Sequence, residues 1–140
     1  MLVSEVMSTD VVSCTREATL HELVGLMLEH GVGSVVVLDE EAIDGIVSES
    51  DALAAAHERG DPLVDIPVET LVGGEIITVP HDAPIRVAVD RMIEHDVKKL
   101  PVIDDFDLVG IVTLTDIVYH LTDIQEEAEA LAFAHYRWQS

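Results

Sequence analysis

The stretch Gly45-Ile-Val-Ser-Glu-Ser-Asp51 recurs 65 residues later as Gly110-Ile-Val-Thr-Leu-Thr-Asp116, and this recurrence decides the fold. The same offset aligns Met27-Leu-Glu-His30 with Met92-Ile-Glu-His95 without a gap. Self-similarity at a fixed period indicates a repeated structural unit. The sequence therefore predicts two copies of one fold within a single chain.

Each copy is expected to contain a short strand, a helix, two strands and a second helix. In the first copy, apolar residues spaced three and four apart from Leu20 to Leu28 predict the helix. Two apolar runs divided by the acidic turn Asp39-Glu-Glu41 predict the pair of strands. The breaker cluster Glu58-Arg-Gly-Asp-Pro62 marks the junction. We therefore place the repeats at residues 1–60 and 61–121.

A small three-stranded sheet cannot cover both of its faces within one such unit. Two units can do so by packing sheet against sheet around a pseudo-twofold axis. The predicted fold class is therefore α/β (α+β), with two β-α-β-β-α repeats. This packing leaves two equivalent clefts at the seam, and a seam between halves is a preferred place for a small ligand.

Composition and charge exclude several classes of protein. The chain has 140 residues, of which 49% are hydrophobic, and no apolar run approaches the length of a membrane span. The net charge of −21, from 7 Lys and Arg against 28 Asp and Glu, disfavours nucleic acid as a partner. No signal-peptide pattern precedes Val3. We expect a cytoplasmic protein that binds neither nucleic acid nor a membrane.

The acidic residues are interleaved with apolar residues along the whole chain instead of gathering in a tail. A dense acidic surface on a well-formed core is typical of proteins from salt-loving organisms. We therefore expect a halophilic archaeal source, with an ordinary acidic cytosolic protein as the alternative.

Both copies resemble a cystathionine-β-synthase (CBS) domain. The resemblance rests on Val3-Ser-Glu-Val-Met7, on the two motifs that end at Asp51 and Asp116, and on Lys99-Leu-Pro-Val-Ile-Asp104 in the second copy. It covers residues 1–121, nearly the whole chain, and implies a stand-alone tandem CBS pair.

The resemblance implies a non-catalytic regulatory module. Such pairs bind adenosine-containing ligands, among them AMP, ADP, ATP and S-adenosylmethionine, between the repeats and signal to a partner protein. It also implies that no cofactor is required and that the chain forms a homodimer. A ligand-free scaffold with decayed nucleotide sites is the alternative. A metal-dependent or redox enzyme ranks last, because the sequence contains no catalytic constellation.

The motif carboxylates Asp51 and Asp116 are the ribose ligands that the resemblance implies. Each motif ends a strand and begins a helix, so the free amides of the first turn and the hydroxyls of Ser48 and Thr113 are available to a phosphate. Both motifs equally match capping boxes, in which the same side chains satisfy backbone amides. Recurrence does not decide between the two roles, because duplication copies a cap as faithfully as a site.

Lys98 and Lys99 are the only lysines in the chain and are candidates to contact a nucleotide phosphate. The resemblance places them in the same cleft as Asp116. The first copy has Gly33 and Ser34 at the equivalent positions, so we expect an anionic nucleotide to prefer the Asp116 cleft. Two ordinary surface lysines at the entrance of a strand are the alternative.

The resemblance also gives four apolar residues as candidate walls of an adenine slot, and each of them equally fits a hydrophobic core. They are Val12, Ala18, Ile77 and Ala83.

Three further features receive structural interpretations. His30 and His95 end equivalent helices, where a partly cationic ring complements the helix dipole; the sequence identifies no third ligand, so we expect no metal site. The single cysteine, Cys14, lies in an apolar run and is expected to be buried. Residues 122–140 are predicted to form a C-terminal helical extension that docks on the module or on a partner copy, with a frayed end as the alternative.

Overall fold

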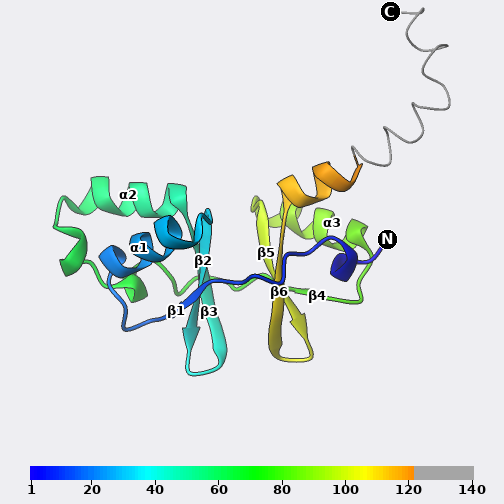
Figure 1. Ribbon diagram of the computed structural model, residues 1–140, viewed down its shortest axis with the longest axis horizontal. Helices are drawn as coiled ribbons and strands as arrows, with labels where there is room; N and C mark the ends of the chain where they lie inside the picture. Colours follow the sequence, from blue (N-terminus) through cyan, green and yellow to red (C-terminus); the bar gives the residue numbers. More distant parts are fainter. Residues whose placement is uncertain (122–140) are drawn as a thin grey trace, which may run out of the picture.

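The computed structural model describes residues 1–121 as two three-stranded sheets that face each other, with the helices on their outer sides (Figure 1). The extension expected at residues 122–140 lies outside the described residues. The first repeat contains β1 (Ser13–Thr15), α1 (Leu20–His30), β2 (Ser34–Asp39), β3 (Ala42–Ser48) and α2 (Glu49–Arg59). The second repeat contains β4 (Val79–Pro80), α3 (Ile85–His95), β5 (Lys99–Asp104), β6 (Asp107–Thr113) and a helix described over residues 114–121.

Strand order and direction are the same in the two sheets. β1 runs parallel to β2, and β2 runs antiparallel to β3; β4, β5 and β6 repeat this pattern. The register shifts at equivalent places, after Val37 in β2 and after Val102 in β5. The predicted α+β fold of two β-α-β-β-α repeats is therefore confirmed.

Local signals fix where the first helix of each repeat begins and ends. Thr19 caps α1, because its Oγ1 accepts the amide of Glu22 at 3.2 Å. α1 ends at Gly31, whose φ is 63°, and α3 ends at the equivalent Asp96, whose φ is 52°. A left-handed residue at this position stops a helix and satisfies its last carbonyls. The chain therefore leaves both helices by the same kind of turn.

Two crossing segments, residues 1–8 and 66–73, each precede the first strand of one repeat and complete the core of the other. Val3, near the start of the chain, is fully buried in the second core. Val68, which precedes the second repeat's first strand, is fully buried in the first core. The repeats therefore exchange segments reciprocally, and this exchange joins them into one body.

Equivalent backbone hydrogen bonds hold the two crossing segments. The amide of Val68 donates to the carbonyl of Ala18 at 2.9 Å, and the amide of Val3 donates to the carbonyl of Ala83 at 2.9 Å. Ala18 is buried in the first core, and Ala83 packs against the second. Neither alanine is among the residues that line the clefts described below, so their place in an adenine slot stays a prediction.

The first glycine of each recurring motif lies directly beneath a crossing segment. A Cβ atom on Gly45 would lie 2.7 Å from Cγ1 of Val72. A Cβ atom on Gly110 would lie 2.6 Å from Sδ of Met7 and 2.8 Å from the carbonyl oxygen of Ser8. These distances are shorter than van der Waals contact, so glycine is required here by the close approach of the other chain segment.

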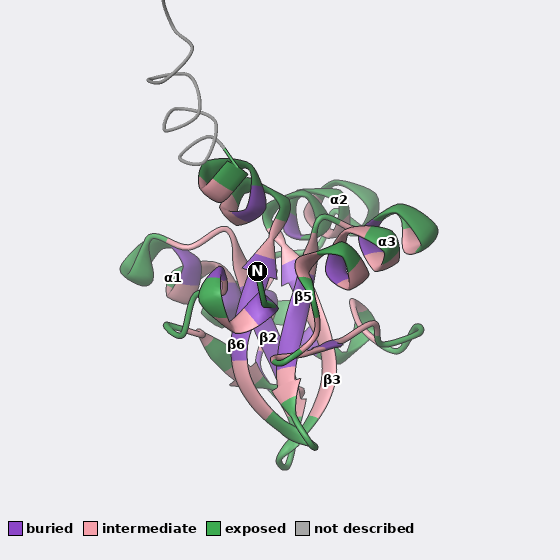
Figure 2. Cartoon of the chain, turned by 90° about the vertical axis from the view of Figure 1, so that its right-hand side faces the viewer, coloured by how far each residue is buried: buried purple, intermediate pink, exposed green. Residues whose placement is uncertain are grey.

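Buried residues are concentrated in the strands and on the helix faces that contact them, while the hairpin tips and outer helix faces are exposed (Figure 2). Within residues 1–121, no helix has the length and apolar character needed to cross a bilayer.

Candidate functional site

The first cleft at the seam, which we call the Asp51 cleft, combines the motif of the first repeat with the strand entrance of the second. Ile46 and Asp51 face Val97, Lys98 and Lys99 across it. The cleft consists of two adjoining hollows of about 270 Å³ and about 650 Å³. A space of this size is typical of small-molecule sites.

The second cleft, the Asp116 cleft, is the pseudo-symmetric counterpart of the first. Ile111 and Asp116 of the second repeat face Val32, Gly33 and Ser34 of the first. Its volume is about 180 Å³. Each motif carboxylate therefore faces the strand entrance of the other repeat.

Both motifs form the capping boxes that the sequence allows. The carboxylate Oδ2 of Asp51 accepts the Ser48 amide at 2.9 Å, and the Ser48 hydroxyl accepts the Asp51 amide at 3.2 Å. Thr113 and Asp116 make the equivalent bonds at 3.1 Å and 3.0 Å. Because capping engages Oδ2 alone, the other oxygen of each carboxylate is available to accept from a ligand hydroxyl. Capping and ligand binding are therefore compatible in this geometry.

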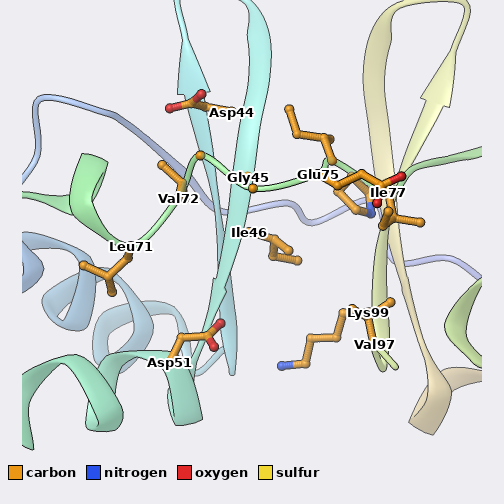
Figure 3. A pocket seen from close by; sticks show the side chains of 14 residues that line it. Asp44, Gly45, Ile46, Asp51, Leu71, Val72, Glu75, Ile77, Val97 and Lys99 are labelled. Atoms are coloured by element: carbon orange, nitrogen blue, oxygen red, sulfur yellow. The ribbon is translucent and has the colours of Figure 1, made fainter. Parts of the chain in front are cut away.

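Lys99 bridges the two repeats. Its backbone pairs with Thr113 in the second sheet, whereas its ammonium donates to the carbonyl oxygen of Gly33 in the first repeat at 2.9 Å. Figure 3 shows the ammonium of Lys99 pointing toward the carboxylate of Asp51. The side chain lines both clefts.

The prediction that both lysines lie in the same cleft as Asp116 is met by Lys99 but not by Lys98. Lys98 lines the Asp51 cleft, and Lys99 is shared between the clefts instead of belonging to the Asp116 cleft alone. Of the two residues expected beside Asp51, Gly33 lines both clefts and Ser34 lines the Asp116 cleft. The reason is the pseudo-twofold packing, which brings each motif against the strand entrance of the opposite repeat.

Two of the four adenine-slot candidates lie at the clefts, at equivalent positions of the repeats. Ile77 lines the Asp51 cleft, and Val12 lines the Asp116 cleft. Sequence reasoning missed the segment from Leu71 to Ile76, which also lines the Asp51 cleft. The adjacent glycines Gly73 and Gly74 are the sequence signal that could have indicated a turn or close backbone contact in this segment, and the φ of Gly73 is 116°.

The Asp51 cleft carries more negative than positive charge. Besides Asp51, four carboxylates line its two hollows, against the two lysines. The four are Asp44, Glu49, Glu75 and Asp96.

Arg16 neutralises part of the acidic surface next to this cleft. Its guanidinium lies 3.2 Å from Asp39, 3.8 Å from Asp44 and 3.6 Å from Glu69. The hydrogen bond to Asp39 and the nearby carboxylates raise the pKa of Arg16, so this cation is permanent. The Oδ2 atom of Asp44 is buried without a hydrogen-bond partner in the structure. Arg16 is therefore engaged by three carboxylates beside the cleft.

The histidines and the cysteine occupy positions close to those predicted. His30 and His95 each lie in the last turn of a helix, and Nδ1 of His95 is 3.9 Å from Glu75. Across residues 1–121, no cluster of three or more His, Cys, Asp or Glu side chains is arranged to hold a metal ion. Cys14 is half-buried against the first core, and burial raises the pKa of its thiol.

Comparison with known proteins finds a matching family model and several similar chains. A family model described as the CBS domain matches residues 3–58 and 68–123. An uncharacterized protein of Methanopyrus kandleri is 34% identical over 89% of this chain, which spans 67% of that relative. Hypoxic response protein 1 of Mycobacterium tuberculosis is 31% identical, with 85% of this chain and 84% of the relative covered.

Solved structures of other proteins share the fold of this chain. A structure of Hypoxic Response Protein I with two coordinated zinc ions matches with a TM-score of 0.76 and 27% identity, over 86% of this chain and 98% of that one. The CBS domain pair of protein MJ0100, in complex with 5′-methylthioadenosine and S-adenosyl-L-methionine, matches with a TM-score of 0.78 and 23% identity, over 88% and 97%. The two relatives come from an archaeon and from a bacterium, so they do not support a halophilic archaeal source for this chain.

Proposed function

This chain belongs to the CBS domain family as a tandem pair, and on that premise we propose that it is a non-catalytic regulatory module that binds an adenosyl ligand in the clefts between its repeats. One observation carries the proposal: two pseudo-symmetric clefts lie at the seam, and each contains a motif carboxylate at the first turn of a helix. The CBS pair of protein MJ0100, which has the same fold, binds two adenosyl compounds.

The proposed ligand contacts follow from the chemistry of each cleft. The oxygen of Asp51 or Asp116 that capping leaves over accepts a hydrogen bond from a ribose hydroxyl. The hydroxyl of Ser48 or Thr113 and the start of the helix that follows favour a phosphate or carboxylate of the ligand. In each first turn two amides are already hydrogen-bonded: those of Glu49 and Asp51, and those of Leu114 and Asp116. Ile77 or Val12 supplies an apolar contact for the adenine ring.

Calorimetry in 1 M KCl against AMP, ATP and S-adenosylmethionine tests this function. Asp51→Ala and Asp116→Ala each remove a charge-assisted contact worth roughly 1.5–3 kcal/mol. We therefore expect each substitution to weaken binding in its own cleft by about tenfold or more.

Loss of a helix cap accompanies both substitutions, so a matched control is needed. Thr19→Ala removes the side-chain cap of α1, at a cost of about 1 kcal/mol. It touches neither cleft, so ligand affinity should stay unchanged. If none of these ligands binds or raises the melting temperature of the native chain, the regulatory function fails and the ligand-free scaffold is favoured.

We also propose that the module forms a homodimer through the outer faces of its helices. Leu28 on α1 and the equivalent Ile93 on α3 are 80% and 74% exposed, and Leu53 on α2 is 72% exposed. An apolar groove of about 500 Å³ runs between α1 and α2 beside Leu28 and Leu53. A contiguous exposed apolar patch, such as the one that Leu28 and Leu53 form at this groove, marks a protein interface better than scattered apolar residues do.

A further inference from the structure

The two clefts differ in the residues that the strand entrance of the opposite repeat contributes to them. The 65-residue offset places Gly33 and Ser34 where Lys98 and Lys99 stand in the second repeat. The Asp51 cleft therefore receives Lys98 and Lys99 from the opposite repeat, whereas the Asp116 cleft receives Ser34 and Gly33, of which Gly33 lines both clefts.

Lys99 is the one cation among the described residues that line the Asp116 cleft, and it also lines the Asp51 cleft. Its ammonium is held at the seam by the Gly33 carbonyl, which also accepts the Glu49 amide at 3.1 Å. An ammonium has three N–H donors, so two remain for a ligand. An anion in one cleft therefore competes for this ammonium with an anion in the other.

The charged side chains other than Lys99 also differ between the two clefts. In the Asp116 cleft, the carboxylates of Asp10 and Asp116 oppose an anion once Lys99 is turned away. In the Asp51 cleft, Lys98 adds a second cation to Lys99. Five carboxylates also line the two hollows of the Asp51 cleft, against two in the Asp116 cleft, so the net charge favours an anion in neither. The preference of an anion for the Asp51 cleft rests on the two ammonium groups placed there, and the carboxylates around them favour a monophosphate over a triphosphate.

Building on the proposed function, we infer that Lys99 is shared between the clefts, so that each chain binds one nucleoside monophosphate, in the Asp51 cleft. The Asp116 cleft is then restricted to an uncharged or cationic nucleoside. The two sites of this module are therefore not interchangeable, although their ribose-binding carboxylates are equivalent.

Calorimetry with AMP as the anionic probe and adenosine as the uncharged probe, in 1 M KCl, tests this inference. Native protein should bind one AMP per chain, with AMP tighter than ATP in the absence of divalent cations. Lys99→Met should weaken AMP by about tenfold to a hundredfold, because it removes a charge-assisted contact. The affinity for adenosine should change by less than about twofold, since adenosine has no charge to pair.

A variant designed to gain a second AMP site provides the more stringent test. Ser34→Lys places an ammonium at the position equivalent to Lys99, where the carbonyl of Lys98 is available as the counterpart of the Gly33 carbonyl. The stoichiometry for AMP should rise from one to two per chain. Adding Asp116→Ala to this variant should return it to one. Thr15→Lys adds the same charge on exposed β1, away from the clefts, and should leave the stoichiometry at one.

The outcomes separate this inference from the function on which it rests. If native protein binds neither AMP nor adenosine, the proposed function fails and the inference falls with it. If native protein binds two AMP per chain with similar affinity, or if folded Ser34→Lys still binds one, the inference is overturned and the regulatory function stands. Should Ser34→Lys not fold, equal loss of AMP and adenosine affinity in Lys99→Met overturns the inference as well.

Discussion

Replacing Gly110 with alanine should displace the N-terminal crossing segment from the second repeat. The new Cβ would lie 2.6 Å from Sδ of Met7 and 2.8 Å from the carbonyl oxygen of Ser8. The methionine side chain can move aside, but the carbonyl belongs to the backbone. Ser8 is also paired with Ile111, through amide-to-carbonyl bonds of 2.8 Å and 2.9 Å. The segment therefore cannot retreat without breaking this pair.

The magnitude follows from these contacts. Overpacking of a well-filled site costs typically about 1–3 kcal/mol, and two lost backbone hydrogen bonds cost about 0.5–1.5 kcal/mol each. Alanine is favoured over glycine in a strand by roughly 0.5–1 kcal/mol, which offsets part of the loss. We expect Gly110→Ala to lower the free energy of unfolding by about 3 kcal/mol, or the melting temperature by roughly 10 °C.

Gly45 provides the matched comparison in the other repeat. Its new Cβ would meet Cγ1 of Val72 at 2.7 Å and Cβ of Val72 at 3.0 Å, so the close contacts are with a side chain. Gly45→Ala should cost about 1 kcal/mol, and Val72→Ala should restore part of it by removing Cγ1. Met7→Ala should restore little in Gly110→Ala, because the Ser8 carbonyl remains.

Urea unfolding followed by far-ultraviolet circular dichroism measures both double-mutant cycles. A Gly110→Ala protein as stable as the native chain would refute the reasoning, as would full recovery in the Met7→Ala double variant. Either result would mean that the crossing segment is not held against β6 as the structure shows.

Three further predictions concern the whole chain. With a net charge of −21, the melting temperature should climb between dilute buffer and 1 M KCl, where the screening length falls to about 3 Å; a melting temperature that ignores salt counts against a halophilic adaptation. Leu28→Glu with Ile93→Glu should convert the proposed dimer to a monomer in light scattering, whereas Phe106→Glu, at a hairpin tip 93% exposed, should not; a native monomer at tens of micromolar would end the dimer proposal. Because burial raises the pKa of the Cys14 thiol, the folded protein contains less Cys14 thiolate at pH 8 than the unfolded chain does. Labelling of Cys14 by a disulfide reagent should therefore be slower in the folded protein and should accelerate as the pH rises; equal labelling rates with and without urea would contradict this.

The fold was predictable because its determinants recur. The two copies of each signal, such as the motifs that end at Asp51 and Asp116, reveal the repeated unit, and the cap at Thr19 is a local property. The capping boxes were likewise readable, because they involve residues three positions apart.

The composition of the clefts was not predictable from the chain alone. Which repeat supplies Lys99 to which carboxylate depends on how the two sheets pack, and no local pattern encodes that choice. The same holds for Ala18, whose carbonyl receives a crossing segment from about fifty residues downstream. Residues close in sequence suggested a site within each repeat, whereas the pseudo-twofold axis builds each site from both.

The reciprocal exchange of residues 1–8 and 66–73 also bears on the order in which the molecule is made. The first repeat lacks part of its core until Ile66 and Val68 have left the ribosome, so synthesis must pass well beyond Arg59 before that half can become stable. The leading segment, made first, must wait unpaired until β6 is complete near Thr113. A cut between the repeats would therefore leave two incomplete halves, each missing what the other carries, and the shortest autonomous folding unit of this protein is the pair.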